Sequence, residues 1–258
     1  MAEIDRCVAR SAGMAFLFLS GERYGWRPLP KIVPKEELEA LVALLPPEDA
    51  AGRDTVALWY RLDSNALPPV YSLRRISECE ADAEGAAAYP AAVRHFWDDG
   101  ARGPGAQSVI QASLRPAAAA AGLAGAERDK WELSVTHHEV QRALDASRNP
   151  RLAQNCLCVV RDIAGLQAAV DGGGAAAKAA RDYHGGAAED VALLQTMRRK
   201  AEASIGEFGS VLKYEAAWAE GGISLSHQGE YVRKLCADVY ARIETDVTRS
   251  FEAYAKVR

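Results

Sequence analysis

The chain has 258 residues, 49% of them hydrophobic and 26% charged, which is enough to bury a core as one large domain or two small ones. A formal net charge of -4 gives no reason to expect nucleic acid or an anionic membrane as a partner. No stretch reaches the roughly 18 apolar residues that a membrane-spanning helix needs, and the charged first residues lack the apolar region of a signal peptide. We therefore expect a cytoplasmic protein.

The first part of the chain alternates helix and strand patterns. Ile4 and Val8 are one helical turn apart, which predicts a helix over residues 2–10, and an apolar run predicts a strand over residues 14–19. Leucines and a valine on one face, with glutamates in the first turn, predict a helix over residues 35–45. The next predicted elements are a helix over residues 55–62, with Val56, Trp59 and Tyr60 inward, and a strand over residues 70–76.

The rest of the chain continues this alternation after one weaker region. Residues 78–130 are acidic and then rich in alanine and glycine, and we predict helices there near residues 90–98 and 105–122. The later predicted elements are a helix over residues 134–147, a strand over 156–160, a flexible glycine-rich insertion over 171–180, a helix over 189–204, a strand over 211–218 and a long helix over 228–257.

Strand patterns that alternate with helix patterns favour an α/β fold over a helical bundle. The residues after about 185 are mostly helical in pattern. We therefore predict three parts: an α/β module over residues 1–165, a Gly/Ala-rich insertion or linker over residues 166–187, and a mostly helical segment over residues 188–258.

The five cysteines are few, odd in number and scattered, which fits a reducing compartment better than a disulfide framework. Cys156 and Cys158 would share one face of a strand, and we interpret them as buried thiols rather than metal ligands or a redox pair. No second cysteine pair completes a zinc site, so we predict no bound metal.

Two further motifs have structural explanations. Residues 136–139 contain two adjacent histidines and a glutamate, but a metal-binding helix places its histidines one turn apart. A capping box, with Thr136 as N-cap and Glu139 reaching back to its amide, explains these residues better. Residues 172–178 lack the Gly-Lys-Ser/Thr end of a phosphate loop, so we expect no ATP binding within this chain.

The candidate functional site is the loop over residues 19–30, which reads LSGERYGWRPLP and follows the predicted strand directly. In α/β sheets, ligands and partners gather where strands end at their carboxyl edge. The guanidinium groups of Arg23 and Arg27 could bind phosphate or carboxylate, and Tyr24 or Trp26 could stack on a base. Alternatively, the prolines and glycines fix a rigid turn and the aromatic side chains fill gaps beneath it, which is the interpretation we favour.

Several segments, in the same order, resemble the N-terminal region of NACHT and WD-repeat domain-containing proteins. The resemblance spans nearly the whole chain and is carried by residues 3–7, 16–30, 59–71, 134–140, 155–161 and 221–236. It implies a TIR-like, flavodoxin-like module with a mostly parallel sheet, which precedes a NACHT domain and a WD-repeat propeller in STAND-type signalling ATPases. Compared with that pattern, which it matches as if truncated at both ends, this chain lacks the first strands of the module and stops before any NACHT domain. We therefore expect a fragment, a mis-started gene model or a shortened relative.

The resemblance also gives Glu3 a role to consider. Glu3 falls on the helix before the first strand, roughly where TIR domains that cleave NAD have a catalytic glutamate. Its carboxylate would orient the ribose hydroxyls and stabilise the charge that develops as nicotinamide leaves. A glutamate near a helix start also has a plain dipole role, which we favour here.

These observations lead to one functional hypothesis and one alternative. We predict a non-enzymatic protein-interaction or regulatory module of a signalling protein, without a cofactor. It would contact protein partners, or a second copy of itself, through Arg23, Tyr24, Trp26 and Arg27. The alternative is a TIR-like enzyme that hydrolyses NAD and uses Glu3.

Overall fold

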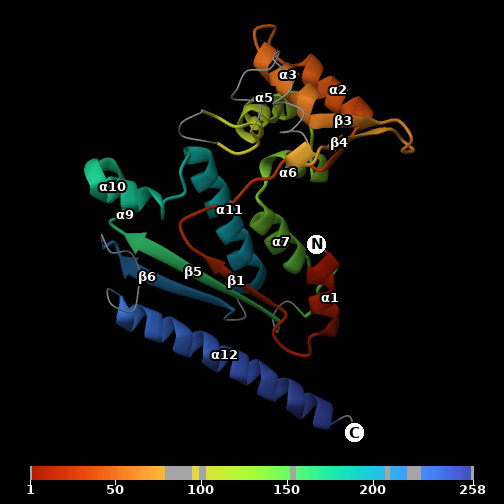
Figure 1. Cartoon of the computed structure of the whole chain (residues 1–258). Coiled ribbons are helices and arrows are strands. Elements are labelled where there is room, and N and C mark those ends of the chain that lie inside the picture. Colours follow the sequence, from red (N-terminus) through yellow and green to blue (C-terminus); the bar gives the residue numbers. More distant parts are fainter. Residues whose placement is uncertain are drawn as a thin grey trace. The chain divides into compact units, whose positions relative to one another are not determined.

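A computed structural model describes residues 2–78, 95–98, 103–151, 155–206, 210–219 and 228–256 (Figure 1). The chain divides into two compact units. The first combines Met1–Trp26 with Ser134–Arg258, and the second is Arg27–Leu133. The second unit is thus inserted in the sequence of the first. The insertion begins at Arg27, within the candidate loop over residues 19–30.

A parallel sheet of three strands forms the centre of the first unit. Its order is β1 (Phe16–Ser20), β5 (Cys156–Ala164) and β6 (Val211–Ala217), with β5 in the middle. Ser20 at the end of β1 pairs with Val160, so β5 continues past β1 and pairs with β6 alone. The sheet therefore has a stepped carboxyl edge.

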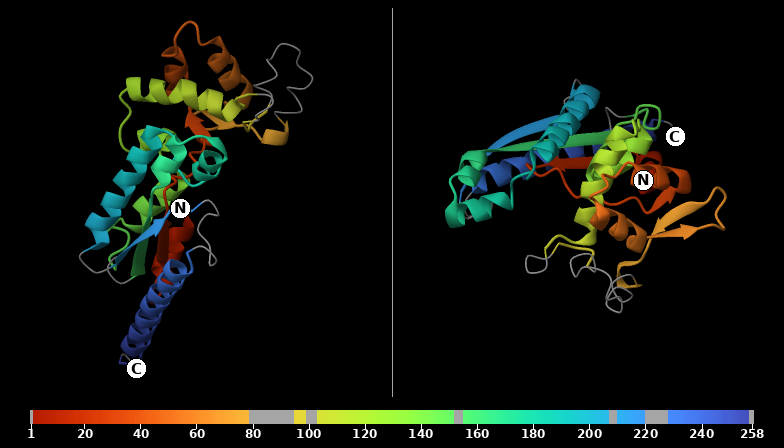
Figure 2. Two further views of the ribbon diagram at one scale, coloured as in Figure 1. Left: turned by 90° about the vertical axis from the view of Figure 1, so that its left-hand side faces the viewer. Right: turned by 90° about the horizontal axis from the view of Figure 1, so that it is seen from above.

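Helices cover both faces of this sheet. In Figures 1 and 2, α7 and α11 lie on one face and the long α12 lies on the other. The short helices α9 and α10 follow β5 along the chain. The helices of this unit are α1 (Ala2–Arg10), α7 (Val135–Ala143), α9 (Leu166–Asp171), α10 (Gly174–Arg181), α11 (Ala188–Ile205) and α12 (Gly229–Ala255).

The core of the first unit lies between the sheet and the helices α7 and α11. Five consecutive residues of β5, from Cys156 to Val160, are buried, as expected for a central parallel strand that is covered on both faces. Phe18 of β1 and Met197 of α11 pack into the same cluster. The cluster comprises Phe18, Tyr24, Val140, Leu144, Cys156, Cys158, Val160, Leu194, Met197, Ala201 and Ile205.

The second unit is built on an antiparallel sheet of order β2-β4-β3. Trp59, which is fully buried, lies in its core. The elements of this unit are β2 (Ile32–Pro34), α2 (Lys35–Ala43), α3 (Ala50–Trp59), β3 (Tyr60–Asp63), β4 (Val70–Leu73), α5 (Ala106–Ala120) and α6 (Ala126–Glu132).

The predicted fold class is confirmed: the protein is mixed α/β, with a parallel sheet, several further helices and a long C-terminal helix, which is consistent with a flavodoxin-like fold. Cys156 and Cys158 are buried in the same cluster, as expected for thiols on one face of a strand. The helices predicted over residues 2–10, 35–45, 105–122, 189–204 and 228–257 are confirmed, as are the strands over 14–19, 70–76, 156–160 and 211–218, with small shifts at their ends.

Three local predictions were wrong. The helix predicted over residues 55–62 ends at Trp59, because Tyr60 pairs with Leu73 and starts β3. The N-cap of α7 is Ser134 and not Thr136: the Ser134 hydroxyl accepts the His137 amide. Residues 171–180, predicted as a flexible insertion, contain most of helix α10, and a glycine with φ of 74° precedes it.

The predicted domain boundaries stay untested. The division at residues 165 and 187 stays a prediction, whereas the compact units of the structure follow another outline. The helix expected near residues 90–98 falls mostly outside the described residues, and residues 95–98 are irregular.

We predict that iodoacetamide at about pH 8 modifies Cys236 in the native protein but spares Cys156 and Cys158. Cys236 is exposed, whereas burial raises the pKa of Cys156 to about 11 and that of Cys158 to about 12. The reactive thiolate is therefore scarce at both buried positions. Peptide mass mapping measures the labelling, with a urea-unfolded sample as control. Rapid native labelling of either buried cysteine would contradict the packing described here.

Candidate functional site

The carboxyl edge of the parallel sheet is held together by Arg198 of α11. This side chain is only 7% exposed. Its Nε donates to the Ser20 hydroxyl at 2.9 Å and one terminal nitrogen donates to the Gly21 carbonyl at 2.7 Å. The same guanidinium donates to the Arg161 carbonyl at 3.1 Å and to the Asp162 carboxylate at 2.7 Å. One cation thus joins the end of β1 to the extension of β5.

The first residues of the loop after β1 are fixed by the neighbouring strand. The Glu22 carboxylate accepts the backbone amide of Ile163 at 2.9 Å, which anchors the loop to β5. A Cβ atom on Gly21 would lie 3.0 Å from a guanidinium nitrogen of Arg161, so a larger residue here would displace the end of that flexible side chain. The loop therefore leaves the sheet in a defined direction.

Tyr24 is the structural anchor of the loop. Its ring is 2% exposed and meets the His137 ring edge-on, with 5.7 Å between centroids. The Tyr24 hydroxyl lies 2.6 Å from His137 Nδ1 and accepts the Ser134 amide at 3.3 Å. The Ser134 hydroxyl in turn donates to the Tyr24 carbonyl at 3.2 Å. The N-terminus of α7 and the loop are thus one hydrogen-bonded unit.

Two of the four predicted contact residues are exposed. The Arg23 side chain is exposed and donates to the Asp182 carbonyl at 3.3 Å. Trp26 is 52% exposed, while its backbone carbonyl accepts the Val135 amide at 3.1 Å. Gly25 between them has a φ of 102°, a conformation that favours glycine and turns the chain between the buried Tyr24 and the exposed Trp26.

Arg27 does not share this environment. It belongs to the second unit and is 7% exposed. Its backbone carbonyl accepts the side-chain amide of Gln111 at 2.5 Å. The structure therefore brings Arg23, Tyr24 and Trp26 together in the first unit and places Arg27 in the other.

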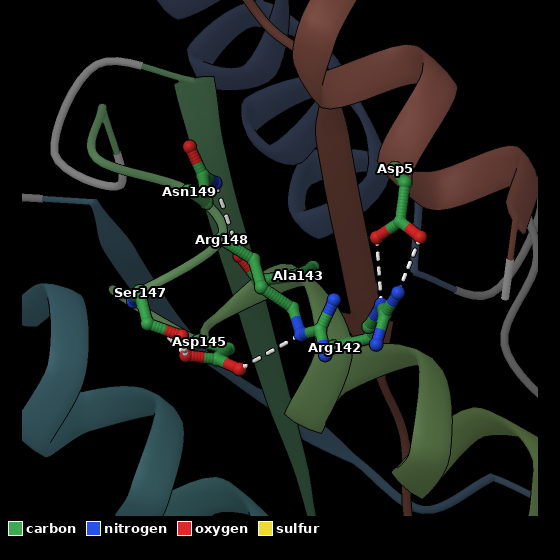
Figure 3. A network of polar contacts seen from close by, with 7 residues as sticks. All are labelled: Asp5, Arg142, Ala143, Asp145, Ser147, Arg148 and Asn149. Carbon is green, nitrogen blue, oxygen red and sulfur yellow. Dashed lines mark hydrogen bonds and ion pairs between the residues drawn. The ribbon is translucent and has the colours of Figure 1, made fainter.

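Glu3 lies at the start of α1, which Figure 3 shows tied to α7 through Asp5 and Arg142. This contact is bidentate, and the hydrogen bond from Arg142 lowers the pKa of Asp5. The Glu3 side chain is 66% exposed and pairs with Arg6 one turn further along the helix. Glu3 is thus a solvated helix residue with a local partner.

The main polar groups at this edge already have partners within the protein. The buried cation Arg198 is occupied by four acceptors, and the Tyr24 hydroxyl is occupied by α7. Within the described ranges, no cluster of three or more His, Cys, Asp or Glu residues could hold a metal ion. Among the helices that the structure describes, none is long and apolar enough to cross a membrane.

Comparison with known proteins relates part of the chain to one named protein. A stretch of 76 residues is 37% identical to NACHT domain- and WD repeat-containing protein 1 of Mus musculus, and the Homo sapiens protein of that name matches equally. The stretch covers 29% of this chain and only 5% of each relative. No protein-family model and no solved structure matches. The predicted relation to NACHT and WD-repeat proteins is thus supported in part, and the TIR-like character stays a prediction.

The sequence analysis missed the residues that organise this site. Arg198 lies in a helix of ordinary composition, and only the register of β1 and β5 reveals what it bonds. His137 was considered as a metal ligand or a cap residue, whereas its ring packs against Tyr24. A signal was available for Glu22, because a carboxylate directly after a buried strand often bonds backbone amides at a sheet edge.

We predict that Arg198→Met lowers the free energy of unfolding by about 3 kcal/mol, because it leaves buried carbonyl and hydroxyl oxygens without donors. Asp162→Asn should cost less than about 1 kcal/mol, since that side chain is 63% exposed and water screens its charge. Urea unfolding of the full chain measures both. Arg199→Met, at the exposed neighbouring position of α11, is the matched control. An Arg198 variant as stable as this control would disprove the assigned role.

Proposed function

We propose that this chain is a protein-interaction or regulatory module of a cytoplasmic signalling protein of the NACHT and WD-repeat type, and that Trp26 and Arg23 contact its partner. One observation carries the proposal. A tryptophan that is 52% exposed stands on a loop whose neighbours are fixed in the core. Exposed tryptophan and arginine side chains on a rigid support are frequent anchors of protein interfaces.

The rigidity of the loop supports this role. Tyr24 is buried against His137, and the backbone on either side of Gly25 is bonded to α7. Binding through such a loop costs little conformational entropy, because the backbone is already ordered before the partner arrives. The partial similarity to NACHT domain- and WD repeat-containing protein 1 supports the signalling context. In a longer protein of that kind, ATP would bind outside this chain, and the partner could be a second copy of the module.

We predict that Trp26→Ala weakens partner binding by at least tenfold and changes thermal stability little, because it removes the proposed interface anchor, whose side chain is 52% exposed. Arg23→Ala should weaken binding less. Quantitative mass spectrometry of proteins captured by each variant, and sedimentation velocity for self-association, measure the effect. Trp97→Ala removes a tryptophan of equal exposure from the second unit and is the matched control. If Trp26→Ala retains the same proteins and the same self-association as Trp97→Ala, the loop is not the interface.

The alternative is NAD hydrolysis by Glu3, which would release nicotinamide. A carboxylate stabilises developing charge most effectively in a site from which water is excluded, and Glu3 is 66% exposed beside Arg6. We therefore predict that the purified chain releases no nicotinamide from NAD above the blank, and that Glu3→Gln behaves identically. Chromatography of the reaction measures the release. Nicotinamide release that Glu3→Gln abolishes would favour the enzyme.

A further inference from the structure

The second unit contains a pocket that is lined by its own residues. It has a volume of about 440 Å³ and lies between α2 and α3, beside strands β3 and β4. This volume is within the range of ligand-binding pockets in general. Carbon atoms of Val42, Ala43, Val56, Ala57 and Tyr60 form much of its lining.

The walls of the pocket are fixed by the core of the unit. Val56 is 4% exposed, and the neighbouring Leu38, which also lines the pocket, is 2% exposed. Tyr60 is 3% exposed, and its hydroxyl donates to the Pro30 carbonyl at 2.8 Å. The pocket is therefore shaped before any partner binds, which keeps the entropic cost of binding low.

The arginine that lines the pocket donates to backbone carbonyls of its own unit. Arg53 donates to the carbonyls of Leu45 and Pro46 beyond the end of α2 and to that of Asp49 before α3. Its guanidinium thus holds the turn between the two helices, and its aliphatic stem lines the pocket. An acidic ligand would have to compete with these carbonyl oxygens for the guanidinium.

The charge that faces a ligand is negative. Glu39 lines the pocket, accepts the Tyr71 hydroxyl at 3.3 Å, and has Lys35 only at 3.9 Å. Its side chain is 51% exposed, so it can reach a cation at the edge of the pocket. Burial and the nearby Glu39 carboxylate raise the pKa of Tyr71, which therefore remains a neutral donor. Charge complementarity selects a basic group beside an apolar one.

The apolar surface continues beyond the pocket on the sheet. Leu62 is directly opposite Tyr71 in the β3–β4 pairing, so both side chains stand on the same face of the sheet. Leu62 is 41% exposed, and this exposed leucine extends the contact surface past Tyr71. A ligand that fills the pocket and also covers Leu62 has to reach from the pocket across Tyr71. A peptide segment is long enough to do so.

We infer that this pocket binds a peptide segment of another protein, which inserts a bulky apolar side chain between α2 and α3 and places a Lys or Arg beside Glu39. The inference is independent of the proposed role of Trp26, since it concerns the other unit. It gives the module a second contact with a partner of defined chemistry: basic and amphipathic.

Selection of random peptides displayed on phage against the full chain tests this inference. The selection is repeated on Ala57→Trp, which fills the pocket from an exposed position of α3. We expect the peptides enriched only on the wild-type protein to combine Leu, Phe or Trp with a nearby Lys or Arg. A synthetic copy of the strongest peptide should bind at least tenfold more weakly to Ala57→Trp, and several-fold more weakly to Glu39→Gln, with reduced dependence on salt.

Matched controls separate this site from the loop. Leu67→Ala alters a leucine that is 94% exposed outside the pocket and should bind the peptide normally. Trp26→Ala should also bind it normally, so failure of either proposal leaves the other intact. A thermal melt confirms that each variant is folded. The inference is overturned if no peptide is enriched, if Ala57→Trp and the wild type select the same peptides, or if the enriched peptides are acidic.

Discussion

The arrangement of the first unit depends on one buried guanidinium. Arg198 donates to the ends of two neighbouring strands and ties Ser20 and Gly21, at the end of β1, to the extension of β5. Polar groups at a sheet edge would otherwise need water or a ligand to satisfy them. At the carboxyl edge of this sheet a protein side chain satisfies these groups.

Contacts at this edge set the conformation of the candidate loop. Its first residues are bonded to β5, and Tyr24 is buried against α7. The chain then turns at Gly25, and Trp26 emerges with half of its surface exposed. Tyr24 is therefore part of the core, whereas Trp26, two residues later, is the residue to which we assign the proposed contact. The favoured sequence interpretation, a rigid turn with aromatic filling, describes Tyr24, and the interaction hypothesis describes Trp26.

The second unit carries the pocket for which we propose a peptide ligand. Its helices α2 and α3 and its antiparallel sheet form a carbon-lined pocket with one acidic group at its edge. An apolar pocket and an exposed tryptophan are both features that the proposed protein contacts would use. The physical properties of the two units thus favour the same class of function, although each is argued from its own residues.

The sequence alone determined the features that depend on local periodicity. The apolar runs marked β1 and β5, the amphipathic pattern marked α2, and the length of α12 was evident. Pairing decided the rest, because it joins residues distant in the chain. Tyr60 has a helical sequence pattern but lies in a strand, because it pairs with Leu73. Arg198 bonds strand ends that are far from it in sequence. Tyr24 and Trp26 are both aromatic and lie two residues apart in the loop, so the sequence did not show which of them is exposed. Packing against α7 buries Tyr24 and leaves Trp26 exposed.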